Sequence, residues 1–98
     1  MADTRPIDPD DFHDFCVADG YDAPADKVYQ PNDRPGFHTH PFDARVLIIK
    51  GMLVMAMTDH EMVLGPGDVC DVPAGTPHSE QTAATGAKGL LAIRRTVA

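Results

Sequence analysis

Short apolar stretches recur along the last two thirds of the chain, and glycine and proline separate them. The strongest is residues 46–49, Val-Leu-Ile-Ile, and residues 52–57 follow directly after Lys50-Gly51. Branched side chains favour strands, and short strands at regular spacing are typical of a sandwich or a barrel. Further strands are predicted at residues 27–30, 62–64, 69–72, 76–82 and 89–95. The pattern therefore predicts an all-β domain.

The two strongest strands are apolar on both faces. A strand with one solvated face alternates apolar and polar side chains, and residues 46–49 and 52–57 do not. Inward side chains can fill a barrel, but outward ones such as Leu47 and Ile49 need another cover. A helix can supply part of that cover and a second copy of the chain the rest. We therefore expect a homodimer.

A helical pattern precedes the strands. Asp8 can cap a helix, Pro9 suits the first helical position, and Gly20 is a natural stop. The side chains expected to pack this short N-terminal helix on the barrel recur at helical spacing: Phe12, Phe15 and Cys16.

The net charge of −7 is placed unevenly. Residues 1–26 hold eight of the fifteen acidic side chains and one of the eight basic ones. We therefore divide the chain into an acidic N-terminal arm with the short helix, residues 1–25, and a barrel, residues 26–98. No cluster of basic residues is present to bind phosphates, which argues against nucleic acid and against anionic membrane surfaces as partners.

Three features favour the cytoplasm. No apolar run approaches the ~20 residues that span a membrane. Residues 1–5 have neither the basic nor the apolar region of a secretory signal. In such a chain Cys16 and Cys70 are expected to be free thiols rather than a disulfide, with Cys70 a small core residue.

Histidines provide the candidate chemistry. His38 and His40 are one residue apart, so on an extended chain both rings lie on one face. His78, from a distant strand, would complete a set of three. Three histidine ligands with open positions are typical of catalytic metal sites, and we predict one divalent transition metal ion, with Fe, Ni, Zn, Mn and Cu as candidates. His13 and His60 are expected to be exposed.

The residues around these histidines resemble the two motifs of the cupin superfamily. The first motif contains H-x-H, a Glu ligand and a glycine, and His38, His40 and Gly51 match it. The second motif is G-x5-P-x-G-x2-H-x3-N, and its matching residues are Gly67, Pro73, Gly75 and His78. The resemblance covers roughly residues 35–95. It implies a cupin-type jelly-roll β-barrel, frequent homodimers, and a divalent metal on the motif histidines.

Two positions depart from the motifs. Ala44 stands where the family has its Glu ligand, and Thr82 stands where it has Asn. Asp43 would replace the missing carboxylate if it turned inward; otherwise it faces out and caps a turn. Glu80 lies two residues after His78 and shares its strand face, so Glu80 is a candidate ligand or catalytic base unless it points outward.

The resemblance implies two classes of function. The first is a metal-dependent enzyme, of dioxygenase or of isomerase and lyase type, acting on a small substrate rich in oxygen. The alternative is a non-catalytic module that binds or senses a small ligand. Fold alone does not separate these classes.

Overall fold

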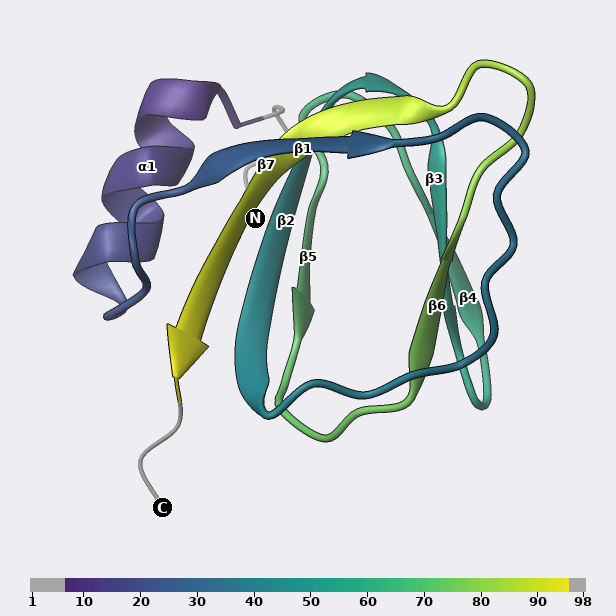
Figure 1. Cartoon of the computed structure of the whole chain (residues 1–98). Coiled ribbons are helices and arrows are strands. Elements are labelled where there is room, and N and C mark those ends of the chain that lie inside the picture. Colours follow the sequence, from purple (N-terminus) through teal and green to yellow (C-terminus); the bar gives the residue numbers. More distant parts are fainter. Residues whose placement is uncertain (1–6, 96–98) are drawn as a thin grey trace, which may run out of the picture.

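The computed structural model describes residues 7–95 and consists of two facing antiparallel sheets with one helix outside them (Figure 1). Strand order is β1-β7-β2-β5 in the larger sheet and β4-β3-β6 in the smaller. The elements are α1 (Pro9–Ala18), β1 (Ala25–Tyr29), β2 (Phe42–Gly51), β3 (Leu53–Met57), β4 (Glu61–Leu64), β5 (Val69–Val72), β6 (His78–Gln81) and β7 (Ala87–Arg95). The predicted all-β jelly roll with a short N-terminal helix is confirmed. The first six residues of the predicted arm and the last three of the predicted barrel lie outside the described residues.

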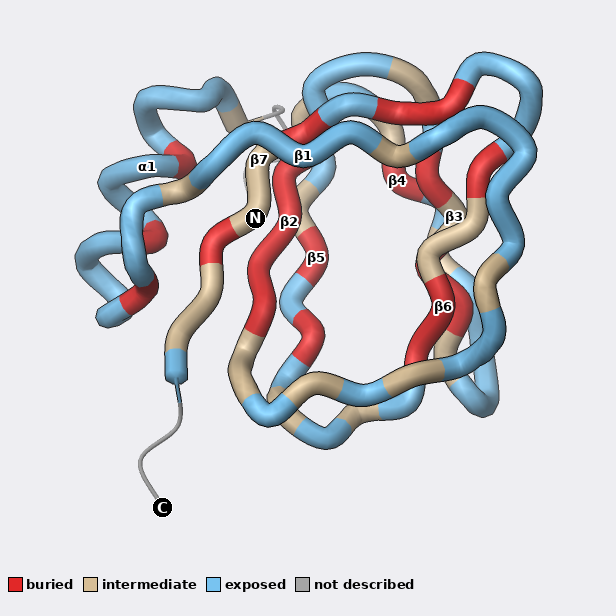
Figure 2. The backbone as a smooth tube through the Cα atoms, in the orientation of Figure 1, coloured by how far each residue is buried: buried red, intermediate tan, exposed pale blue. Residues whose placement is uncertain are grey.

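The two sheets are not closed into a barrel, so this part of the prediction needs correction. Within residues 7–95, each of the seven strands pairs only with strands of its own sheet. The sheets are held together by side chains that meet between them, which is the packing of a sandwich. Figure 2 shows buried positions on both sheets where they face each other. These core side chains include Val46 and Ile48 of β2 and Leu53 and Met55 of β3.

Strand β2 begins at Phe42, four residues before the predicted start. It pairs with β7 along most of its length and with β5 over residues 44–47. Side chains alternate along it, so Phe42, Ala44 and Val46 line the space between the sheets. Asp43 and Arg45 point to the other side, where they bond to Arg94 and to Asp71 respectively.

The helix covers the outer face of the larger sheet. Asp8 caps it, because its Oδ1 accepts a hydrogen bond from the backbone N–H of Asp11 at 2.9 Å. Phe12 and Cys16 are fully buried and pack with Leu47, which is 1% exposed. Leu47 is therefore covered by the chain's own helix, and it does not need the second subunit that the sequence suggested.

Phe15 does not join this apolar contact, although its spacing predicted that it would. It is 43% exposed, and the guanidinium carbon of Arg45 lies 4.0 Å from its ring centroid. Arg45 is itself buried and donates hydrogen bonds to Asp71 at 2.7 Å and to Asp19 at 2.8 Å. These long-range ion pairs link the end of α1 to β2 and β5. Phe15 packs on the Arg45 guanidinium and stays partly exposed to solvent.

Gly51, the glycine of the first motif, cannot be replaced by a larger residue without strain. Its φ is +81°, and a Cβ there would lie 2.3 Å from the carbonyl oxygen of Gly86. The sharp turn between β2 and β3 therefore requires glycine.

The two cysteines lie in different apolar clusters: Cys16 packs under the helix and Cys70 lies between the sheets. Both are free. Burial raises the pKa of the Cys70 thiol to about 11, so this group is a neutral core side chain near neutral pH. No helix among residues 7–95 is long and apolar enough to cross a membrane.

Candidate metal centre

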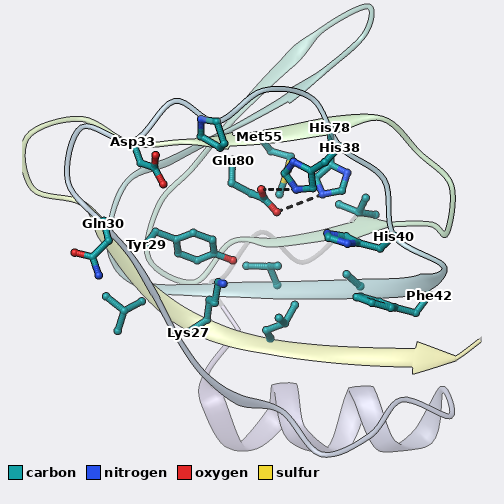
Figure 3. Close-up of a pocket in the computed structure, with 16 residues that line it drawn as sticks. Lys27, Tyr29, Gln30, Asp33, His38, His40, Phe42, Met55, His78 and Glu80 are labelled. Atoms are coloured by element: carbon teal, nitrogen blue, oxygen red, sulfur yellow. Dashed lines mark ion pairs between the residues drawn. The ribbon is translucent and has the colours of Figure 1, made fainter.

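A pocket of about 380 Å³ opens between the two sheets. The three histidines of the motifs all line it, and so does Glu80. His38 and His40 come from the segment between β1 and β2, whereas His78 and Glu80 are both on β6. The backbones of His38 and His78 are joined by two hydrogen bonds, of 2.9 and 3.1 Å. Figure 3 shows the four side chains converging at one end of the pocket.

The donor atoms of this group are close enough to share one ion. One nitrogen or oxygen atom from each of His38, His40, His78 and Glu80 lies within 4.8 Å of those of the others. Glu80 Oε2 is 3.2 Å from His38 Nε2, and Glu80 Oε1 is 3.3 Å from His78 Nε2. The sequence left open whether Glu80 points outward or into the cavity, and in the structure it points into the cavity.

Backbone carbonyls orient two of the rings. The Nδ1 of His78 lies 2.8 Å from the carbonyl oxygen of Thr76, and the Nδ1 of His38 lies 3.1 Å from that of Gly36. A carbonyl oxygen only accepts, so Nδ1 carries the hydrogen in both rings. In the neutral rings Nε2 then presents its lone pair to Glu80, which is the orientation of a metal-binding histidine.

The contacts of Glu80 with His38 and His78 need a positive charge between the carboxylate and the rings. A neutral Nε2 and a carboxylate oxygen both present lone pairs, so they repel at 3.2 and 3.3 Å unless a cation or a proton lies between them. A proton joins one nitrogen to one oxygen, whereas a divalent ion can satisfy all four groups at once. The set of three histidines and one glutamate could therefore bind a metal ion.

His40 is held by packing instead. Its ring is stacked on that of Phe42, with centroids 4.8 Å apart and planes 8° from parallel. Burial lowers the pKa of His40, and positive charge on His78 or His38 lowers it further. His40 therefore stays neutral, and able to ligate, at a lower pH than an ordinary imidazole.

Asp43 is turned away from this group, so the inward alternative for it is wrong. Its carboxylate accepts hydrogen bonds from the backbone N–H of Ala74 at 2.8 Å and from Arg94 at 2.9 and 3.1 Å. The Ala74 bond, followed by those from Arg94, lowers the pKa of Asp43. Asp43 thus caps the turn at Ala74, while Ala44 faces the pocket.

Thr82, the second departure from the motif, has a structural role. Its hydroxyl donates to the carbonyl oxygen of Gln30 and accepts from the backbone N–H of Asp33 at 3.0 Å. Gln30 and Asp33 both line the pocket. The buried hydroxyl therefore holds one wall of the pocket in place.

The sequence did not single out the part of the pocket wall that β1 forms. Lys27 and Tyr29 of β1 both line the cavity. Their spacing of two predicts that they share one face of a strand. The sequence does not show which sheet this strand joins, so it does not place that face toward the pocket. Burial, followed by the negative charge of Glu80, raises the pKa of the Tyr29 hydroxyl, which therefore remains a hydrogen-bond donor.

The other two histidines lie outside this centre, as predicted. The side chains of His13 and His60 are 52% and 55% exposed, and each contacts the aspartate next to it in sequence.

Comparison with known proteins supports the same family. A family model described as Cupin domain matches residues 26–93. No curated protein sequence matches the chain. A protein of unknown function from Rhizobium leguminosarum is 18% identical with a TM-score of 0.70, covering 76% of this chain and 70% of that one.

Two structures with stated activities are also similar. The DMSP lyase DddQ from Ruegeria pomeroyi is 28% identical with a TM-score of 0.68, covering 76% of this chain but only 39% of that one. The polyketide cyclase RemF from Streptomyces resistomycificus is 20% identical with a TM-score of 0.63, covering 84% and 66%. At 20% identity, the likeness to RemF shows a shared fold alone.

Proposed function

Because this chain belongs to the cupin domain family, we propose that its pocket is a metal-dependent active site. His38, His40 and His78 bind one divalent transition metal ion, and Glu80 supplies the carboxylate that the family usually takes from the position of Ala44. The observation that carries this proposal is the placement of Glu80 Oε2 and Oε1 at 3.2 and 3.3 Å from the Nε2 atoms of His38 and His78.

The reaction we propose is of the isomerase or lyase type, on a small substrate rich in oxygen. When bound, the ion acts as a Lewis acid that polarises a substrate oxygen. Such reactions begin with removal of a proton from the adjacent carbon, and a carboxylate within reach is the usual base. Glu80 has two oxygens, so one can hold the ion while the other accepts the proton. The 28% identity to a lyase supports this class over the dioxygenases.

Elemental analysis of protein purified without a metal-chelating tag tests the first half of the proposal. We expect close to one equivalent of Fe, Ni, Zn, Mn or Cu per chain. Turnover of small hydroxy and keto acids by the loaded protein tests the second half. Metal and ligand binding without turnover of any of them would instead favour the non-catalytic binding or sensing module.

Metal occupancy should fall as the pH is lowered from about 7 to 5. Protons compete with the ion for each imidazole, and at pH 5 a histidine with the reference pKa of about 6.5 is only about 3% neutral. His40, whose pKa is lowered, resists this loss longer than an ordinary histidine. Equilibrium dialysis of Zn²⁺ against a chelator at stepped pH measures the effect. Occupancy unchanged at pH 4.5 would contradict histidine ligation.

We also propose that the protein is a homodimer, with β1 and β2 at the contact. Val28 and Ile49 are 54% and 44% exposed, and they line one depression formed by β1, β2 and β7 of the larger sheet. Asp26, Lys27 and Lys88 line the same depression. In a two-fold contact the acidic group of one copy can meet the basic group of the other around an apolar centre.

Replacing Ile49 by lysine should therefore shift the protein toward the monomer. A charge at the centre of an apolar contact is unpaired and desolvated, which opposes association. Light scattering at micromolar concentration measures the change. Val63 is 61% exposed on the other sheet, so Val63→Lys is the matched control and should leave the mass unchanged. A native mass near 10.6 kDa would refute the dimer.

A further inference from the structure

The wall of the pocket that faces the histidines carries a second polar group, which the proposed metal centre does not use. Lys27 and Tyr29 lie two residues apart on the edge strand β1, and both line the pocket, Lys27 as an exposed residue and Tyr29 as a half-buried one. Figure 3 shows the Lys27 amine beside the Tyr29 ring, and the Tyr29 hydroxyl directed toward the histidines. The pocket therefore has polar groups at two opposed ends.

Neither side chain has a polar partner among residues 7–95. The Lys27 ammonium lies 5.5 Å from the centroid of the Tyr29 ring, and no described carboxylate is within the 4.0 Å of an ion pair. The Tyr29 hydroxyl makes no hydrogen bond to a described residue. No fully buried side-chain polar atom in this part of the chain lacks a partner, so this hydroxyl is open to the pocket.

Lys27 is an exposed residue that brings a positive charge to the lining of the pocket. The chain has a net charge of −7, yet Lys27 is the one lysine or arginine among the described residues that line the pocket. The other charged side chains in that lining are Asp33 and Glu80, and neither pairs with Lys27. An ammonium and a phenolic hydroxyl that both lack partners offer donors without an acceptor, and a carboxylate is the small group that accepts from both.

Apolar side chains also line the pocket. Val46 of β2 and Leu91 of β7 are partners in the larger sheet, which joins β1 through β7, and Met55 of β3 is the partner of Glu80. A ligand that spans the cavity therefore needs a polar group at each end and a short hydrocarbon portion between them.

We propose that the pocket binds a short hydroxy or keto carboxylic acid, with its carboxylate on Lys27 and Tyr29 and its other oxygen at the histidine end. This inference rests on the proposed metal-dependent function and names its substrate class. Lys27 and Tyr29 are then specificity residues: they hold the acid so that the carbon next to the second oxygen lies near Glu80.

The test compares 3-hydroxypropionate with its primary amide, which has the same hydroxyl and nearly the same shape but no charge. Both are titrated by NMR into the Zn²⁺-loaded protein and into the metal-free protein. We expect the acid to bind at least about fivefold more tightly than the amide in both forms, because Lys27 is present in both. Lys27→Met, which keeps the hydrocarbon stem over Tyr29, should reduce the preference to within about twofold.

Two variants serve as controls. Lys27→Arg should retain the preference for the acid, because it keeps the charge. Lys50→Met removes a lysine of the same sheet that does not line this pocket, so it should change nothing. Equal binding of acid and amide to the wild type, no binding of either at about 50 mM, or an unchanged preference in Lys27→Met would each overturn the inference.

The two proposals fail in different ways. If the protein takes up no metal, the proposed function fails, while the metal-free titration still tests Lys27. If metal binds but the acid is preferred only in the loaded protein, and equally so in Lys27→Met, the carboxylate binds the ion and the role of Lys27 is refuted.

Discussion

Replacing His40 by alanine should weaken Zn²⁺ binding by about a hundredfold or more. His40 is one of four groups whose donor atoms lie within 4.8 Å of one another, so its loss removes a direct ligand. Loss of a partner that merely orients a ligand already costs ten- to a hundredfold in affinity. Competition between the protein and a chromogenic chelator at pH 7.5 measures the dissociation constant.

His40 is the best of the three histidines for this experiment. Its ring packs against Phe42 and makes no hydrogen bond to another described side chain, so alanine removes a ligand without breaking a polar contact. His78 is fully buried and bonds to Thr76, so His78→Ala should also abolish binding but at a larger cost in stability. Thermal unfolding of each metal-free variant separates the two effects.

The exposed histidines are matched controls. His13→Ala and His60→Ala remove the same chemical group from sites outside the pocket and should leave the affinity within about twofold. Wild-type affinity in His40→Ala, or an equal loss in His60→Ala, would show that Zn²⁺ binds elsewhere on the chain.

The shared face of His38 and His40 could be predicted from a local rule, whereas joining His78 to them depends on the resemblance to the two cupin motifs. His38 and His40 share a face through their spacing of two, and Gly75 and Gly51 mark turns that need a positive φ. The same alternation along β2 turns Ala44 toward the pocket. It left Glu80 undecided, because a residue that shares a face with His78 can still bend outward near the end of a strand.

The remaining features depend on contacts between distant segments. Lys27 and Tyr29 reach the pocket only because β1 pairs with β7, and nothing in residues 25–29 specifies that partner. Phe15 lies at helical spacing for the apolar face, but Arg45 reaches across from β2 to contact its ring. Whether the two sheets close or remain a sandwich depends on the pairing of their edge strands, which alternation along one strand does not encode.

We expect that the carboxylate ligand can be moved from β6 to β2 by two substitutions. Glu80→Ala should weaken metal binding by about tenfold or more, because its two oxygens lie 3.2 and 3.3 Å from the histidine nitrogens. Tenfold corresponds to about 1.4 kcal/mol of lost coordination. The same substitution should also abolish turnover, since it removes the proposed base. Isothermal titration with Zn²⁺ measures the first effect.

Ala44→Glu should then restore binding in the Glu80→Ala background. Ala44 is on β2, where its side chain lines the same pocket, and the family places its carboxylate ligand at this position. In the wild-type background the same change should tighten binding by less than tenfold, because Glu80 already supplies a carboxylate and a second one adds repulsion. The affinity gained by Ala44→Glu therefore depends on whether Glu80 is present.

The opposite pattern would mean that the natural site has three histidines and an open position. In that case Ala44→Glu alone would tighten binding tenfold or more, and Glu80→Ala would leave the affinity unchanged. Asp43→Ala is the control for a carboxylate next to the site but outside it, and it should not affect binding because Asp43 bonds to Arg94 and Ala74. A large loss of affinity in Asp43→Ala, with its melting temperature unchanged, would contradict the outward orientation on which this assignment to Glu80 depends.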